Sequence, residues 1–117
     1  MKKVVINGDK KLTGTIRISG AKNAAVALIP AAILTDEEVT ICNVPEISDI
    51  DALEEILEFL NVKVKRATES IIINTKNMKN KSIPEGIAKK LRASYYFMGA
   101  LLAKYKEVEM YFPGGCN

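Results

Sequence analysis

The chain has 117 residues, of which 48% are hydrophobic and 26% are charged, and its formal net charge is +3. This composition is that of one globular domain with an apolar core, and it argues against a disordered, collagen-like or coiled-coil chain. The small net charge does not indicate nucleic acid as a partner. There is no histidine, which excludes imidazole bases, histidine-containing catalytic triads and histidine-ligated metals.

Cysteine usage and hydropathy narrow the class of protein further. Cys42 and Cys116 lie too far apart in the sequence to form a metal-ligand pair, so we expect no metal. The longest apolar run covers residues 24–34, which is shorter than the ~20 residues needed to span a bilayer. No signal-peptide core follows the charged amino terminus. The sequence therefore predicts a cytoplasmic protein without a membrane partner.

The first third of the chain predicts two strands and a helix. Residues 3–6 are rich in β-formers and residues 12–19 alternate between apolar and polar, so these two runs should pair as strands. Residues 22–34 are apolar almost all round, which is typical of a buried helix. Pro30 should kink or shorten that helix.

A strand, an amphipathic helix and a hairpin are predicted next. Residues 38–43 predict a strand in which Cys42 is a small core residue. Residues 48–51 resemble a capping box, which predicts a helix start. The strands at 62–65 and 70–74 should form a hairpin. The predicted buried side of the helix consists of Ile50, Leu53, Leu57 and Leu60.

Basic residues gather between Asn61 and Lys81, a stretch in which Glu69 is the only acid. They belong either to a solvated surface hairpin or to a basic rim that attracts anionic substrates. No aromatic residue is interleaved with them, so a stacking platform for single-stranded nucleic acid is not supported. The basic residues are Lys63, Lys65, Arg66, Lys76, Lys79 and Lys81.

The last third of the chain predicts a helix, a strand and a loop. The helix should begin near Pro84, the strand covers residues 106–112, and the loop covers residues 113–117. Helices and strands alternate with hairpins along the whole chain, so we expect an α/β fold (α+β) with a mixed sheet. The predicted buried side of this helix consists of Ile87, Leu91, Met98 and Leu102.

The first segment that could carry chemistry is residues 19–23, between a strand and a helix start. Backbone N–H groups at a helix amino terminus favour anions, and Gly20 allows close approach of the backbone. Lys22 adds a positive charge and Asn23 adds a donor and an acceptor. The segment fits a phosphate or a carboxylate, although many such turns hold no ligand.

The second segment lies on the last predicted helix. Lys89, Arg92, Tyr96 and Gly99 recur at spacings of three, four and three, which places them on one helix face. Arg92 offers a planar fork to a phosphate or carboxylate, and Tyr96 could lie against a base or sugar. Alternatively, the arginine stem covers apolar surface and the tyrosines fill the core.

The third segment is Gly114-Gly115-Cys116. The two glycines predict a mobile loop with an exposed thiol. Because a thiol is mostly protonated at neutral pH, it can donate a proton as well as attack. The alternative is an incidental loop cysteine.

Taken in order, these segments resemble the bacterial UDP-N-acetylglucosamine enolpyruvyl transferases. The resemblance covers nearly the whole chain, and the ordered set of motifs is more specific than any one of them. The matching runs are Ser19–Ala24, Asn43–Pro45, Arg92–Ser94 and Pro113–Cys116.

The resemblance implies a reaction and a role for each candidate. The enolpyruvyl group of phosphoenolpyruvate moves to the 3-hydroxyl of UDP-N-acetylglucosamine, and phosphate leaves, without a metal or organic cofactor. Lys22 would bind phosphoenolpyruvate, and Asn23 would contact the substrates beside it. Arg92 would hold the UDP-sugar. Cys116 would donate the proton to the methylene carbon and would be the target of fosfomycin. This is the first committed step of peptidoglycan synthesis, so cell-wall biogenesis, cell shape and cell division are the implied processes.

The resemblance also implies a fold, an inside-out α/β barrel of β-α-β-α-β-β repeats that is incomplete here. Residues 1–21 would be strands of the domain completed by a missing C-terminal part, and residues 22–117 would be the first part of the second domain. We expect this chain alone to be inactive. Two alternatives stay open. One is the shikimate-pathway enolpyruvyl transferase, which has a Lys-Ser pattern where this chain has Lys22-Asn23. The other is a non-catalytic regulatory or binding module derived from the enzyme.

Overall fold

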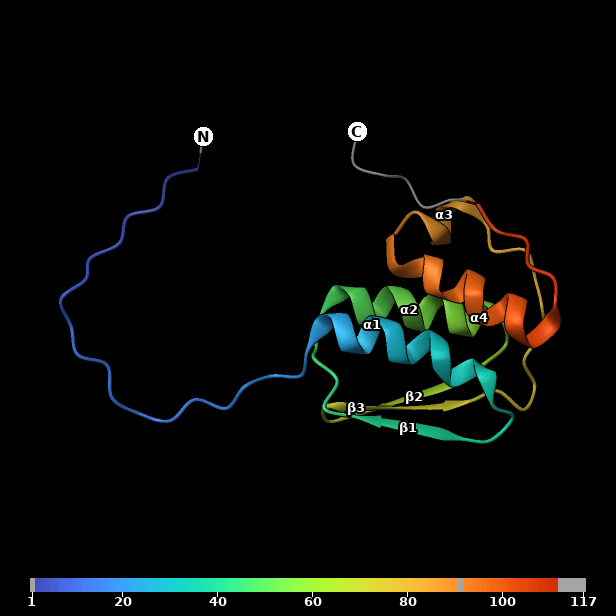
Figure 1. Cartoon of the computed structure of the whole chain (residues 1–117), viewed down its shortest axis with the longest axis horizontal. Coiled ribbons are helices and arrows are strands. Elements are labelled where there is room, and N and C mark those ends of the chain that lie inside the picture. Colours follow the sequence, from blue (N-terminus) through green and yellow to red (C-terminus); the bar gives the residue numbers. More distant parts are fainter. Residues whose placement is uncertain (1, 91, 112–117) are drawn as a thin grey trace.

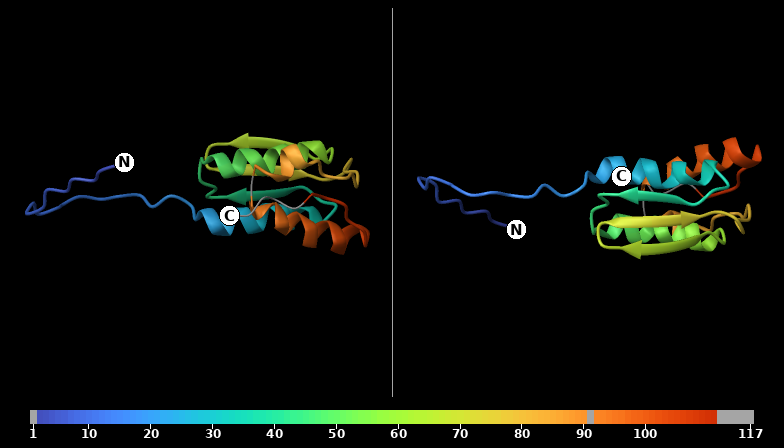
Figure 2. Two further views of the ribbon diagram at one scale, coloured as in Figure 1. Left: turned by 90° about the horizontal axis from the view of Figure 1, so that it is seen from above. Right: turned by 90° about the horizontal axis from the view of Figure 1, so that it is seen from below.

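The computed structural model describes residues 2–90 and 92–111, and it consists of an extended arm and a layered body (Figure 1). The loop predicted at residues 113–117, which includes Cys116, lies outside the described residues. In the body, helices cover one face of a small sheet (Figure 2). The core forms between these two layers, as the apolar faces of helices and sheet require.

The arm corrects the prediction of two paired strands. No strand forms in residues 2–21, and Figures 1 and 2 show this segment extending away from the body. A strand needs a neighbour that pairs with its backbone hydrogen-bonding groups, and none of the described strands pairs with the arm. Its large apolar residues are all more than 70% exposed, and they are Val4, Val5, Ile6, Leu12, Ile16 and Ile18.

The first helix confirms the prediction for residues 22–34 in part. Helix α1 covers Lys22–Ala31, and a 3-10 turn, η1, follows at Ala32–Leu34. Pro30 stands in the last turn and lacks an N–H for the helical ladder, so the expected shortening is confirmed. The helix is not buried all round, because Leu28 is 53% exposed.

The sheet has three strands in the order β1-β3-β2, and both pairings are antiparallel. The strands are β1 (Val39–Cys42), β2 (Lys63–Ala67) and β3 (Ser70–Asn74). The predicted hairpin is therefore confirmed, and the prediction of a mixed sheet is wrong for the strands that the structure describes. The β2–β3 turn reverses the chain at Glu69, whose φ is 55°, and β1 then pairs with the other edge of β3.

Strand alternation also corrects the prediction that Cys42 is a core residue. Side chains of successive residues in a strand point to opposite faces. Ile41 is partly buried and packs against the core, so Cys42 points to the outer face and is exposed.

Helix α2 covers Ser48–Phe59 and packs its apolar side against the sheet. The predicted buried side is confirmed, since Ile50, Leu53, Leu57 and Leu60 are all fully buried. The predicted capping box is wrong. Ile47 is the N-cap, no side chain caps the helix, and Ser48 already lies inside it.

The predicted last helix is broken into three pieces. They are α3 (Glu85–Ala88), a 3-10 turn η2 (Arg92–Ser94) and α4 (Tyr95–Tyr105). The hydroxyl of Ser94 donates a hydrogen bond to the carbonyl of Ala88 at 3.3 Å and so satisfies a carbonyl at the end of α3.

The break changes which residues face the core. Phe97, Ala100 and Leu101 are buried in α4, whereas the expected core residue Leu102 is 50% exposed. The predicted strand at 106–112 is also wrong for its described part, where Met110 makes only an isolated parallel bridge to Ile83.

Deleting residues 2–16 should leave the melting temperature of the body within about 2 °C of the full chain, because this segment buries almost no apolar surface. The deletion keeps Arg17, which connects the arm to the body by pairing with Glu69 at 2.7 Å and is itself 80% exposed. Circular dichroism melts of the two chains test this. Leu57→Ala, which empties a fully buried site, is the positive control and should cost roughly 2–5 kcal/mol. A truncation as damaging as Leu57→Ala would contradict the fold described.

Candidate substrate-binding site

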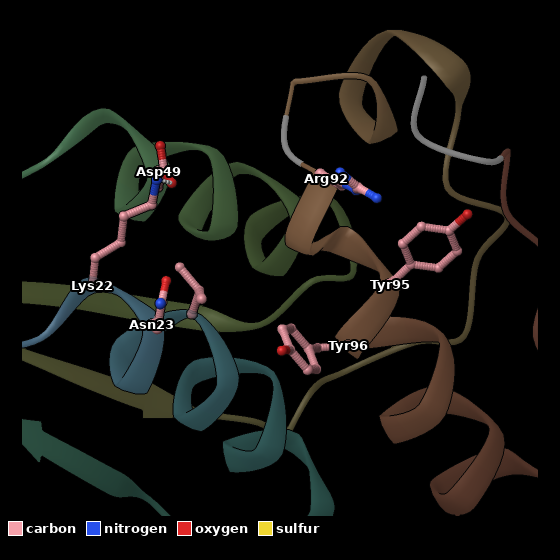
Figure 3. Close-up of a pocket in the computed structure, with 7 residues that line it drawn as sticks. Lys22, Asn23, Asp49, Arg92, Tyr95 and Tyr96 are labelled. Atoms are coloured by element: carbon pink, nitrogen blue, oxygen red, sulfur yellow. Dashed lines mark ion pairs between the residues drawn. The ribbon is translucent and has the colours of Figure 1, made fainter. Parts of the chain in front are cut away.

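A pocket of about 370 Å³ lies between the amino end of α1 and the junction of η2 with α4. It brings together residues from three separate parts of the chain, as Figure 3 shows. Two of the predicted segments, residues 19–23 and the one that holds Arg92, therefore meet in space. The lining residues are Lys22, Asn23, Val26, Asp49, Arg92, Tyr95 and Tyr96.

Lys22 is the first residue of α1, and no side chain caps this helix end. Its backbone amides therefore present the positive end of the helix dipole beside the lysine charge. The predicted close approach at Gly20 is made by the chain itself. A Cβ atom at Gly20 would lie 1.7 Å from the carbonyl oxygen of Asn43, so only glycine lets this loop reach the start of α1.

Asp49 is the residue that sequence reasoning missed. Its carboxylate lies 2.8 Å from the Lys22 ammonium, and its side chain is only 23% exposed. The carboxylate comes from the first turn of α2 and reaches the pocket wall opposite Arg92 (Figure 3). The only signal in the sequence was an acidic residue in a first helical turn. Because such residues are common there, that signal did not indicate a site.

Arg92 is exposed in η2 and makes no ion pair with any residue that the structure describes. The predicted common face of Lys89, Arg92, Tyr96 and Gly99 is wrong, because the chain turns between α3 and α4. Lys89 remains with α3 and pairs with Glu85 at 2.7 Å. Arg92 and Tyr96 still meet, since both line the pocket.

The tyrosines form the side of the pocket nearest α4. Tyr96 is 52% exposed, so the alternative in which it fills the core is wrong. In Figure 3 its ring points from α4 toward α1, whereas the ring of Tyr95 points to the other side. Tyr96 also borders a second, apolar hollow between α1 and α4.

The charges in the pocket are two cations, Lys22 and Arg92, and one carboxylate, Asp49. With the end of α1, this arrangement suits a phosphate or carboxylate group. Within residues 2–90 and 92–111, no three His, Cys, Asp or Glu side chains gather closely enough to hold a metal ion. In the same ranges, no helix combines the length and the apolar character needed to cross a membrane.

The basic residues of the β2–β3 region do not contribute to this pocket. Lys63 and Lys65 are exposed on the outer face of β2. Arg66 turns to α2, where it pairs with Asp51 at 3.3 Å and with Glu54 at 3.1 Å. A solvated hairpin accounts for the basic stretch, and a basic rim of the pocket does not.

Comparison with known proteins gives the context of the pocket. The family model described as EPSP synthase (3-phosphoshikimate 1-carboxyvinyltransferase) matches residues 6–117. The chain is 53% identical over 116 residues to UDP-N-acetylglucosamine 1-carboxyvinyltransferase 2 of Oceanobacillus iheyensis, covering 99% of this chain and 27% of that protein. It is 49% identical over 119 residues to the Lactococcus lactis protein of the same description, covering 100% and 28%.

A solved structure supports the fold. The enolpyruvyl transferase NikO from Streptomyces tendae superposes with a TM-score of 0.72 at 24% sequence identity, over 84% of this chain and 23% of that one. The resemblance to bacterial UDP-N-acetylglucosamine enolpyruvyl transferases is confirmed, and the chain spans about a quarter of the length of these relatives.

Proposed function

The chain belongs to the EPSP synthase family, and from this membership we propose that it is part of an enzyme that transfers the enolpyruvyl group of phosphoenolpyruvate to the 3-hydroxyl of UDP-N-acetylglucosamine. One observation carries the proposal. Lys22 and Arg92 are far apart in the sequence, but both line the same pocket. Both substrates are anions, and two cations beside a helix amino terminus match them. The product would serve peptidoglycan synthesis in the cytoplasm.

The two cations differ in what they can bind. Lys22 is a point charge at the start of α1, and with Asn23 beside it we assign it to phosphoenolpyruvate. Arg92 has a planar fork that fits two oxygens of a phosphate, and we assign it to the UDP-sugar. Tyr96 offers an aromatic face at the same wall for the sugar or base.

The proposed reaction is an addition followed by an elimination. The sugar oxygen bonds to C2 of phosphoenolpyruvate as the hydroxyl proton leaves to a base outside this segment, and Cys116 gives a proton to C3. C3 then loses a proton, phosphate leaves from C2, and the double bond is restored. Lys22 would stabilise the charge on the departing phosphate.

The same resemblance supports a division of the chain between two domains. We assign residues 1–21 to the domain that the remainder of the enzyme completes, and residues 22–117 to the beginning of the other domain. The exposed apolar residues of the arm agree with strands whose partners belong to that remainder. The 117-residue chain alone should then be inactive, because it provides only one wall of the substrate cleft.

The test is a chimera in which residues 1–117 replace the matching segment of the Oceanobacillus iheyensis enzyme. Phosphate release should require both phosphoenolpyruvate and UDP-N-acetylglucosamine, and shikimate 3-phosphate should not replace the nucleotide sugar. The unmodified host enzyme and the 117-residue chain are the two controls. A folded chimera that is inactive with UDP-N-acetylglucosamine, or active with shikimate 3-phosphate, would refute the proposed function.

A further inference from the structure

The Lys22–Asp49 pair occupies the place where the proposed function needs an anion. The two charged groups are 2.8 Å apart, and both residues line the pocket. The Asp49 carboxylate is therefore the anion that Lys22 binds when no ligand is there. Arg92 has no such partner among the residues that the structure describes.

We propose that Asp49 is an internal counter-anion, which the anionic group of the ligand displaces from Lys22. The inference rests on the proposed function, since it assumes that the ligand's anion binds at Lys22. It gives Asp49 a role in setting affinity. The carboxylate holds the ammonium in the pocket, and it also opposes the binding and retention of phosphate.

The Lys22 ammonium and the Asp49 carboxylate would each remain stabilised after the ligand separates them. Lys22 is 59% exposed, so its long side chain is free to turn toward a ligand. Asp49 lies in the first turn of α2, which has no side-chain cap, so the amino end of that helix stabilises the carboxylate after Lys22 leaves. Neither group would be left as a buried, unpaired charge.

The charge arithmetic predicts the sign of the effect. Lys22, Arg92 and Asp49 together carry one net positive charge, and removal of the Asp49 charge raises it to two. The Asp49 carboxylate repels a phosphate bound within a few ångströms of it, and the solvent in the open pocket reduces this repulsion. A purely structural role for Asp49 predicts the opposite result, because loss of the ion pair would then disorder the site and weaken binding.

The experiment is a titration of the 117-residue chain with inorganic phosphate at low ionic strength, followed by amide NMR shifts of Lys22 and Asn23. Asp49→Asn should bind phosphate about threefold to tenfold more tightly than the wild-type chain. Asp49→Ala should do the same, which separates the charge effect from any hydrogen bond that the new amide donates. Binding by these two variants that is no tighter than wild type would overturn the proposal.

Two control variants test whether the effect is specific to the negative charge of Asp49. Asp51→Asn removes a carboxylate from the same turn of α2, but this carboxylate pairs with Arg66 and does not line the pocket, so phosphate affinity should stay within about twofold. Asp49→Glu keeps the charge and should also remain near wild type. A gain in Asp51→Asn equal to that in Asp49→Asn would overturn the proposal, because net charge alone would then explain both. Thermal melts verify that each variant is folded.

Lys22→Met separates this inference from the proposed function. If Lys22→Met leaves phosphate affinity unchanged, the anion site of the proposed function is wrong. If Lys22→Met weakens binding but Asp49→Asn does not strengthen it, the anion site stands and only the counter-anion role is refuted.

Discussion

Lys22→Ala in the chimera is expected to weaken phosphoenolpyruvate binding by roughly 2–5 kcal/mol, which is about 30-fold to several thousand-fold in Kd. The reason is that the closed cleft of the complete enzyme would hold the phosphate away from water, so the loss of one charged partner leaves the other uncompensated. In the isolated chain Lys22 is 59% exposed, and the loss should be much smaller there. Calorimetric titration of phosphoenolpyruvate into the chimera measures the effect.

Arg92→Ala is the companion variant and should weaken mainly the UDP-sugar. Lys89→Ala is the matched control, because Lys89 precedes Arg92 by less than one helical turn but pairs with Glu85 and does not line the pocket. The Lys89→Ala chimera should bind phosphoenolpyruvate and the UDP-sugar with unchanged affinity. Unchanged substrate affinities and unchanged turnover in both Lys22→Ala and Arg92→Ala would show that neither residue binds substrate.

Cys116→Ser in the chimera should lower turnover by about two to four orders of magnitude while substrate binding survives. Serine keeps the shape of the side chain, but its hydroxyl is a far weaker acid than a thiol, so C3 of phosphoenolpyruvate would lack its proton donor. Cys116→Asp supplies a carboxylic acid if loop closure keeps it protonated, and it should retain much more activity. Steady-state phosphate release compares the unmodified chimera with its Cys116→Ser, Cys116→Asp and Cys116→Ala variants, and full activity in Cys116→Ala would show that Cys116 is not the proton donor.

Labelling with fosfomycin, an electrophilic epoxide, gives a second reading of the same residue. The adduct should form on Cys116 and not on Cys42, and both Cys116 variants should resist it. Cys42 is exposed on β1, so burial does not protect it from the reagent. Labelling of Cys116 alone would therefore show that the Cys116 thiol is the more reactive of the two. Mass spectrometry that finds the adduct on Cys42 alone would contradict the assignment.

Local patterns in the sequence were sufficient to predict the elements that bury a regular apolar face. The spacing of Ile50, Leu53 and Leu57 predicted the buried side of α2, and all three are fully buried. The β2–β3 hairpin was equally predictable, because both of its strands and its turn lie within one short stretch. In these elements the sequence pattern and the tertiary contacts favour the same structure.

Elements that depend on distant partners were not predictable in this way. Residues 12–19 alternate as a strand should, but no described segment pairs with them, so the pattern alone did not give a strand. The periodicity of residues 84–105 predicted one helix, whereas a hydrogen bond from Ser94 to Ala88 accompanies a turn between α3 and α4. That turn gives α4 a different buried face from the one predicted, with Phe97 in the core.

The candidate site was predictable from the ordered motifs and not from spacing. Spacing placed Lys89 beside Arg92, which is wrong, whereas the resemblance grouped Lys22, Asn23 and Arg92, which the structure brings to one pocket. Neither residue spacing nor the resemblance identified Asp49. Its position beside Lys22 depends on the packing of α2 against α1, which no local sequence pattern encodes.

The most direct test of the central claim is a crystal structure of the Cys116→Ser chimera with phosphoenolpyruvate and UDP-N-acetylglucosamine bound. We expect the Lys22 ammonium within hydrogen-bond distance of a phosphoenolpyruvate oxygen, the Arg92 guanidinium on the UDP-sugar, and Asp49 released from Lys22. Substrates bound away from the pocket between α1 and α4, with Lys22 still paired to Asp49, would contradict the claim.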